Sequence, residues 1–253
     1  MDKELRVAKE IALKAGEIMR RYFYADQEKV IKDDGTPLTI ADTTINSMVI
    51  EELAKEFPED GVIGEEESTT SYGMGRKWFC DPIDGTKAYT WGVPTAMFSL
   101  GLIVDGIPKA GVAYDPFLDL MYFAEAGKGA FCNDQPIHVS DQSLSEGTVA
   151  ITSGADEIRQ NQPYLNRLID TAGSVAVFSG AVYRSVLIAR GRIEGYILPK
   201  LNAHDMAAVH VIIEEAGGKV TGLDGKQIDY SKPFRGAIAS NATTHDELVE
   251  ILN

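Results

Sequence analysis

The 253-residue sequence contains only two cysteines and four histidines, and its 24 Lys and Arg residues face 38 Asp and Glu residues, which gives a formal net charge of −14. Two cysteines, Cys80 and Cys132, are too few for a disulfide scaffold, and we expect reduced thiols in a cytoplasmic protein. The shortage of basic groups argues against nucleic acid and anionic lipid as partners, because both are held mainly by Lys and Arg. The apolar runs are far shorter than a membrane span, and we expect neither a membrane segment nor a signal peptide.

The composition is otherwise that of a soluble globular protein, with 44% hydrophobic and 25% charged residues. The length allows one large or two small domains with a substantial core. Apolar residues recur at intervals of three and four over residues 3–24, which predicts an amphipathic helix. After turn residues at 32–37, a second helix is predicted to be capped within 41–44 and to end before Pro58.

The pattern changes twice along the rest of the chain. Short apolar runs broken by Gly and Pro predict a meander of strands at 78–80, 96–104, 109–114 and 120–123. After residue 139, strands predicted at 148–152, 175–178 and 193–198 alternate with helices predicted at 158–172, 181–189 and 204–216. This alternation favours an α/β unit with some parallel pairing. We therefore divide the chain near Ser140, into an α+β half, 1–140, and an α/β half, 141–253.

The most informative segment contains two carboxylates on either side of a proline. Pro82 pushes Asp81 toward an extended backbone, and Asp84 is predicted to follow after one tight turn, three positions after Asp81. The two carboxylates can face one point, with the Ile83 carbonyl oxygen between them, as an all-oxygen site for a hard cation. The alternative is an Asp-Pro turn followed by a helix cap.

The residues after this segment suit an anion. Gly85 has no Cβ, so a phosphate can approach the backbone amides of Gly85 and Thr86, and a helix starting there adds its dipole. Three other carboxylates occupy notable positions: Glu65 after an apolar strand, and Asp42 and Asp205 at helix starts. Each has a plain structural alternative, a strand end for Glu65 and a helix N-cap for the two aspartates.

Convergence of these carboxylates requires cations. Two carboxylates ~4 Å apart repel by about 4 kcal/mol at an effective dielectric near 20. Carboxylate and carbonyl ligands favour Mg²⁺ or Mn²⁺ over Zn²⁺, and the histidines have no Zn-type spacing with cysteine.

Several motifs together resemble the inositol monophosphatase family of Mg²⁺-dependent, lithium-sensitive phosphatases. They occur in the family's order and spacing at 64–66, 81–86 and 204–208, with further matches at 32–42, 111–116, 179–184 and 189–192. The resemblance implies an αβαβα layered sandwich, α/β (α+β) in class. By the same resemblance, the first half would hold an antiparallel sheet, the second half would hold a mixed sheet, and the protein would form a homodimer.

The resemblance also assigns roles to residues. Two or three Mg²⁺ ions would be bound by Glu65, Asp81, the Ile83 carbonyl, Asp84 and Asp205. Glu65 and Thr86 would orient a metal-activated water for in-line attack, and Asp42 would polarise the Thr86 hydroxyl. The implied substrate-binding residues are Asp84, Gly85, Thr86, Gly180, Ala181, Arg184 and Asp205, and Glu66 and Lys32 would lie beside the metal ligands.

Two departures bear on the substrate, a small phosphorylated metabolite. Leu198 stands where inositol-specific members carry a Glu, and His204 replaces a common Trp. Arg184 and Lys200 could recognise a second phosphate or a carboxylate, or could be solvated side chains. The candidate substrates therefore stay open: a sugar or polyol phosphate, histidinol phosphate, fructose 1,6-bisphosphate or a 3′(2′),5′-bisphosphate nucleotide. A Mg²⁺-dependent binding protein without activity is the alternative outside enzymes, and retention of the motif residues argues against it.

Overall fold

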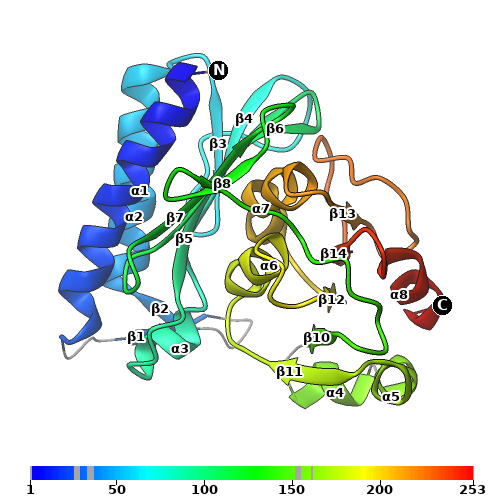
Figure 1. Ribbon diagram of the computed structural model, residues 1–253. Coiled ribbons are helices and arrows are strands. Elements are labelled where there is room, and N and C mark those ends of the chain that lie inside the picture. The colour runs from blue at the N-terminus through cyan, green and yellow to red at the C-terminus, as the bar shows by residue number, and fades with distance from the viewer. Residues whose placement is uncertain (1, 26–28, 33–36, 152–154, 161, 253) are drawn as a thin grey trace.

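The computed structural model describes residues 2–25, 29–32, 37–151, 155–160 and 162–252, and Figure 1 shows five layers of secondary structure in them. Helices α1 and α2 cover the outer face of a seven-stranded sheet, α6 and α7 lie between this sheet and a five-stranded sheet, and α4, α5 and α8 cover the far side. The αβαβα sandwich is therefore confirmed. None of the described helices combines the length and apolar character needed to cross a membrane.

The first layer contains α1, Asp2–Phe23, and α2, Ile40–Glu56, close to the helices predicted from periodicity. The N-cap of α2 is Thr39, upstream of the predicted cap at 41–44. The Thr39 hydroxyl accepts hydrogen bonds from the Ala41 and Asp42 amides, and the Asp42 carboxylate accepts one from the Thr39 amide. Asp42 is therefore the third helical residue of a capping box, with its side chain fixed at the helix start. The short strands β1, Lys29–Ile31, and β2, Pro37–Thr39, pair before it, and the predicted turn at 33–36 lies outside the described residues.

The seven-stranded sheet follows chain order from β3 to β9. Its strands are β3 (Gly61–Gly64), β4 (Arg76–Asp84), β5 (Met97–Val104), β6 (Ile107–Asp115), β7 (Leu120–Glu125), β8 (Ala130–Cys132) and β9 (Gln135–Pro136). Every pair is antiparallel except β3 with β4, which is parallel. Parallel pairing brings the carboxyl end of β3, and Glu65 after it, beside Cys80 and Asp81 of β4.

Strand β4 continues further than the predicted 78–80. Its pairing with β5 shifts between Asp81 and Asp84, so a β-bulge replaces the predicted tight turn between the two carboxylates. Strand β4 ends at Asp84. Gly85 follows with a φ of +83°, which suits a residue without a side chain, and α3, Thr86–Thr90, begins directly after it.

The five-stranded sheet has the order β11-β10-β12-β14-β13. Its strands are β10 (Thr148–Ile151), β11 (Ser174–Val177), β12 (Gly195–Leu198), β13 (Gly218–Thr221) and β14 (Ala237–Asn241). Strand β10 pairs in parallel with β11 and β12, whereas β14 pairs antiparallel with β12 and β13, so the sheet is mixed as expected.

Helices of the second half pack on both sides of this sheet. Between the sheets lie α6, Ala181–Ala189, and α7, Ala203–Glu215, while α8, His245–Leu252, packs outside. The helix predicted at 158–172 is two elements, α4, Ala155–Gln160, and α5, Gln162–Thr171.

Helix α7 approaches the seven-stranded sheet through two glycines. A methyl group at Gly111 would lie 2.2 Å from the Ala208 carbonyl oxygen, and one at Gly101 would lie 2.6 Å from the Ala208 amide nitrogen. Glycine therefore sets how close α7, and the Asp205 side chain on it, comes to β4, β5 and β6.

We expect Gly111→Ala to lower the free energy of unfolding by about 1–3 kcal/mol, because the added methyl group must push the backbone of α7 off the sheet. Gly222→Ala is the matched control, since its methyl group would lie 3.0 Å from the Asp224 carboxylate, which can turn away, and at an ordinary contact distance of 3.6 Å from the Lys226 carbonyl oxygen. Urea denaturation of both variants tests this, and equal stability of the two would contradict the close-packing argument.

Candidate active site

A cavity of about 420 Å³ lies where the two halves of the chain meet, a volume typical of small-molecule sites. Residues from both halves line it: Pro37, Glu65, Asp81, Ile83, Asp84, Gly85, Thr86, Lys87, Lys200, Leu201, Asn202, His204 and Asp205. All the predicted metal ligands are among them.

Three carboxylates form the centre of this cavity. Asp81, Asp84 and Asp205 each offer an oxygen atom, and these atoms lie within 4.8 Å of one another. Asp81 is only 2% exposed, and its Oδ1 has no hydrogen-bond partner among the described residues. A buried carboxylate oxygen without a partner is costly, so the position suits a cation.

Asp84 is held by the start of α6. Its Oδ1 accepts a hydrogen bond from the Ala181 amide at 2.7 Å, and its Oδ2 accepts from the Val182 and Tyr183 amides at 3.0 and 3.3 Å. A methyl group at Gly180 would lie 2.5 Å from Oδ2, so glycine is required for this approach. The Asp84 carboxylate thus occupies the anion position that a helix N-terminus provides.

Asp205 is oriented by a capping box like that of Asp42. Its Oδ2 accepts a hydrogen bond from the Asn202 amide at 2.6 Å, and Asn202 is the N-cap of α7. The helix-cap alternative therefore applies to Asn202, with Asp205 in the third helical position. The second carboxylate oxygen, Oδ1, lies 3.8 Å from Nε2 of His204.

The pKa values of these carboxyl groups are raised, because the groups are buried and lie close to one another. Burial, together with the charges of Glu65, Asp84 and Asp205, raises the pKa of Asp81 well above its ordinary value. Burial and Asp205 raise the pKa of Asp84 to about 7, although the α6 amides oppose this. Burial also raises the pKa of Asp205. The metal-free cluster therefore holds its negative charge at a cost.

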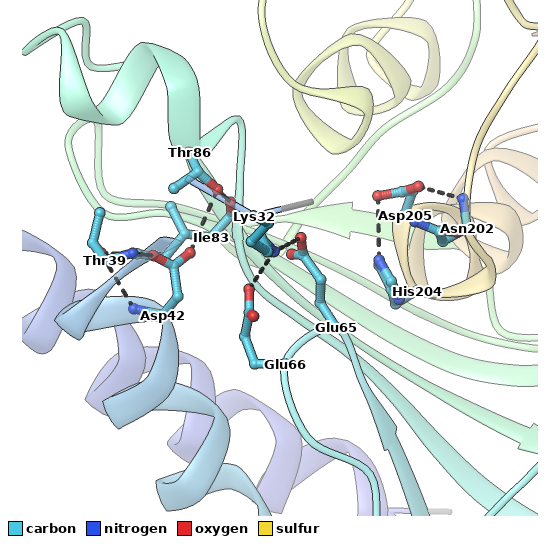
Figure 2. Close-up of polar contacts among 10 residues, drawn as sticks. All are labelled: Lys32, Thr39, Asp42, Glu65, Glu66, Ile83, Thr86, Asn202, His204 and Asp205. Carbon is cyan, nitrogen blue, oxygen red and sulfur yellow. Dashed lines mark hydrogen bonds and ion pairs between the residues drawn. The ribbon is translucent and has the colours of Figure 1, made fainter. Parts of the chain in front are cut away.

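Asp42 and Thr86 form a second group on the other side of Glu65 (Figure 2). The Thr86 hydroxyl donates to the Ile83 carbonyl oxygen at 2.9 Å and lies 3.4 Å from Oδ1 of Asp42. Burial raises the pKa of Asp42 to about 6, although two hydrogen bonds from Thr39 act to lower it. The structure therefore brings the predicted Asp42–Thr86 pair together.

Lys32 bridges the two glutamates at the end of β3 (Figure 2). Its ammonium lies 2.8 Å from Oε1 of Glu65 and 2.7 Å from Oε1 of Glu66. Burial opposes the Lys32 charge, but these two hydrogen bonds raise the pKa of Lys32 overall. Lys32 thus neutralises Glu65, which lines the same cavity as the three aspartates.

Three residues predicted to bind substrate lie elsewhere. Arg184 is 5% exposed, because its guanidinium stacks 4.5 Å from the Tyr196 ring and donates to the Phe178 carbonyl and the Tyr196 hydroxyl. It is neither solvated nor on the cavity wall. Gly180 and Ala181 also lie off the wall, because the start of α6 is used to hold Asp84. A role of these three residues in substrate binding therefore stays a prediction.

Lys87 lines the cavity and was not predicted. The only sequence signal for it is its place directly after Thr86, since exposed lysines are common. The Lys87 ammonium lies 5.4 Å from the centre of the Trp91 ring.

The donor set fits a hard divalent cation. Its atoms are carboxylate oxygens, joined by the Ile83 carbonyl oxygen on the cavity wall, and one of them lacks a partner. Oxygen ligands of this kind suit Mg²⁺, Mn²⁺ or Ca²⁺ better than Zn²⁺.

Comparisons with known proteins agree with this site. The sequence profile of the inositol monophosphatase family matches residues 1–253. The chain is 34% identical to a histidinol-phosphatase of Mycobacterium tuberculosis, covering 99% of this chain and 98% of that one. It is 32% identical to a fructose-1,6-bisphosphatase/inositol-1-monophosphatase of Thermotoga maritima, covering 85% and 82%. Among solved structures, a Thermotoga maritima IMPase superimposes with a TM-score of 0.90 at 29% identity, covering 100% and 97%.

Fold, site and relatives define a phosphoric monoester hydrolase that acts on small phosphorylated substrates. The chain belongs to the inositol monophosphatase family.

In protein treated with a chelator, we expect Asp81→Asn to increase the free energy of unfolding at pH 8 by at least about 1 kcal/mol, because it removes an unpaired buried charge. A raised pKa in the folded state contributes stability below the ordinary pKa, and this contribution is lost as pH rises. The gain should therefore be smaller at pH 5 than at pH 8.

Chemical denaturation at both pH values measures this gain. Asp224→Asn is the control, because that carboxylate is exposed and paired with Lys226. An Asp81→Asn protein no more stable than the natural one at pH 8 would show that repulsion does not limit stability here.

Proposed function

We propose that this protein is a Mg²⁺-dependent phosphatase that hydrolyses a small phosphate monoester at the carboxylate cavity. The observation that carries the metal assignment is the Asp81, Asp84 and Asp205 group, with its unpartnered buried oxygen. Asp81, Asp84, Asp205, Glu65 and the Ile83 carbonyl oxygen would hold two or three Mg²⁺ ions, and Mn²⁺ could replace them. When bound, the ions would lower the pKa of water and neutralise charge on the attacking and leaving oxygens.

The chain's own residues supply orientation. Thr86 lies on the cavity wall, and its hydroxyl is fixed between the Ile83 carbonyl and Asp42, so its oxygen can accept a hydrogen bond from an attacking water. Glu65 faces the same cavity and can take the proton of that water, while Lys32 holds its carboxylate in place. Gly85 and Thr86 line the same cavity, where their backbone amides can meet a phosphate. Positioning and neutralisation are most of what phosphoryl transfer needs from a protein.

The alcohol side of the cavity does not favour inositol. Leu198, at the position of the inositol-binding Glu, is 2% exposed and packs in the core between the sheets. We therefore infer weak discrimination among inositol phosphates. Histidinol phosphate, fructose 1,6-bisphosphate and other sugar or nucleotide phosphates stay candidates, as the names of the relatives indicate.

Three further proposals follow from the family resemblance and the composition. We propose a homodimer, inhibition by Li⁺ and a cytoplasmic location, the last supported by two buried free cysteines, Cys80 and Cys132. We also propose that residues 1–140 supply most metal ligands, and that 141–253 supply Asp205 and part of the pocket.

We expect Thr86→Ala to lower kcat at least a hundredfold with little change in melting temperature, because it removes the hydroxyl that orients water. Thr86 is preferred to Asp84 for this test, since Asp84 also holds α6. Thr90→Ala is the matched control on the same helix, because its hydroxyl donates to the Lys87 carbonyl and to no other residue in the described part of the chain. Steady-state phosphate release measures both, and equal kcat values would refute the role of Thr86.

Removal of divalent cations should abolish phosphate release, because the proposed reaction depends on ions that activate water and neutralise charge. Mg²⁺ should restore the activity, because the carboxylate cluster offers the oxygen ligands that this ion prefers. We expect Mn²⁺ to support turnover and Li⁺ to inhibit the Mg²⁺-loaded enzyme. A phosphate-release assay with chelated protein, titrated with each ion, checks this. Full turnover in the presence of chelator would contradict the proposed mechanism.

A further inference from the structure

The cavity wall has an acidic part and a basic part. Its four carboxylates, Glu65, Asp81, Asp84 and Asp205, are all in the part proposed to bind metal. Among the described residues that line the rest of the cavity there is no carboxylate; these residues are Pro37, Gly85, Thr86, Lys87, Lys200, Leu201, Asn202 and His204. Once cations neutralise the acidic part, the remaining charge of the wall comes from lysines.

Lys200 is the lysine best placed to meet a ligand. It follows β12 in the segment that leads to α7, it is exposed, and its ammonium has no hydrogen bond or ion pair with any described residue. Lys32, by contrast, is engaged by two glutamates, and Lys87 lies against the Trp91 ring directly beside Thr86. An ammonium without a partner at a cavity wall can bind an anion without giving up an existing contact.

Neighbouring positions cannot take over this role. Arg184, the other basic residue considered for a second anion, is buried and already bonded to Phe178 and Tyr196. Leu198 is buried in the core, so β12 presents no carboxylate at the point where it meets the pocket. Any charge recognition from this segment therefore depends on Lys200.

We propose that Lys200 is a specificity-determining residue that selects phosphate esters whose alcohol carries a second anionic group. This inference rests on the phosphatase activity proposed above. A phosphate or carboxylate on the alcohol gains a charge-assisted contact with the Lys200 ammonium, whereas an alcohol with its own ammonium is repelled. Anionic esters are therefore preferred to histidinol phosphate, although a relative 34% identical to this chain is a histidinol-phosphatase.

The test compares kcat/KM for four esters with saturating Mg²⁺. Fructose 1,6-bisphosphate carries a second phosphate, 3-phosphoglycerate carries a carboxylate, glycerol 2-phosphate has a neutral alcohol, and histidinol phosphate has a cationic one. In the natural protein, we expect at least one of the two anionic esters to exceed histidinol phosphate at least tenfold. The ester that does so identifies which anion the site takes.

Lys200→Gln should lower kcat/KM for the preferred anionic ester about tenfold, mainly through a higher KM. The same variant should change glycerol 2-phosphate less than twofold and should raise kcat/KM for histidinol phosphate. Lys200→Arg keeps the charge and should retain most of the preference. Lys226→Gln, an exposed lysine that lines a different cavity, is the control and should change none of the four.

The outcomes separate this inference from the proposed function. A preference for histidinol phosphate in the natural protein, or equal effects of Lys200→Gln on all four esters, overturns the role of Lys200 while leaving a phosphatase. Absence of Mg²⁺-dependent turnover of every ester, glycerol 2-phosphate included, overturns both.

Discussion

Repulsion among buried carboxylates is the constraint on which the rest of this structure depends. Asp81, Asp84, Asp205 and Glu65 line one cavity, and each is supported differently. Lys32 neutralises Glu65, the α6 amides hold Asp84, and the Asn202 amide holds Asp205. Asp81 has an oxygen with no such support among the described residues. The fold thus stabilises every carboxylate but one by protein contacts, and that one, Asp81, has the buried oxygen whose position suits a cation.

These supports tie the two halves of the chain together. Asp84 ends a strand of the first sheet, yet its hydrogen bonds come from a helix that packs against the second sheet. Asp205 reaches the same point from α7, which the glycines of β5 and β6 allow to lie close. Metal binding would therefore stabilise the contact between the halves as well as the site itself.

The sequence indicated the type of ligand atoms in the candidate site better than it indicated where the helix caps and Arg184 lie. Residue types alone indicated oxygen ligands, and periodicity located α1 and α6 closely. The sequence did not reveal that Thr39 and Asn202 are the N-caps of α2 and α7. At a helix start, the side chains of Asp, Asn and Thr can each bond the same backbone amides, so the sequence does not tell which residue is the cap. Nor did it show that Arg184 is buried, since a lone Arg on a helix has no local signal for a tertiary partner. The bulge between Asp81 and Asp84 depends on pairing with β5, which is a contact between distant residues.

The segment that carries Lys200 lies between β12 and α7 and contributes no proposed metal ligand of its own. The groups proposed to act on the phosphate come instead from β4, α2, α3, the first turn of α7 and Glu65 after β3. With the role proposed for Lys200, substitutions between Leu198 and Leu201 would alter the alcohol that is accepted while phosphate cleavage stays intact. Such a division would allow one scaffold to accept new substrates through changes in a few wall residues, without changes in the groups proposed to cleave the phosphate.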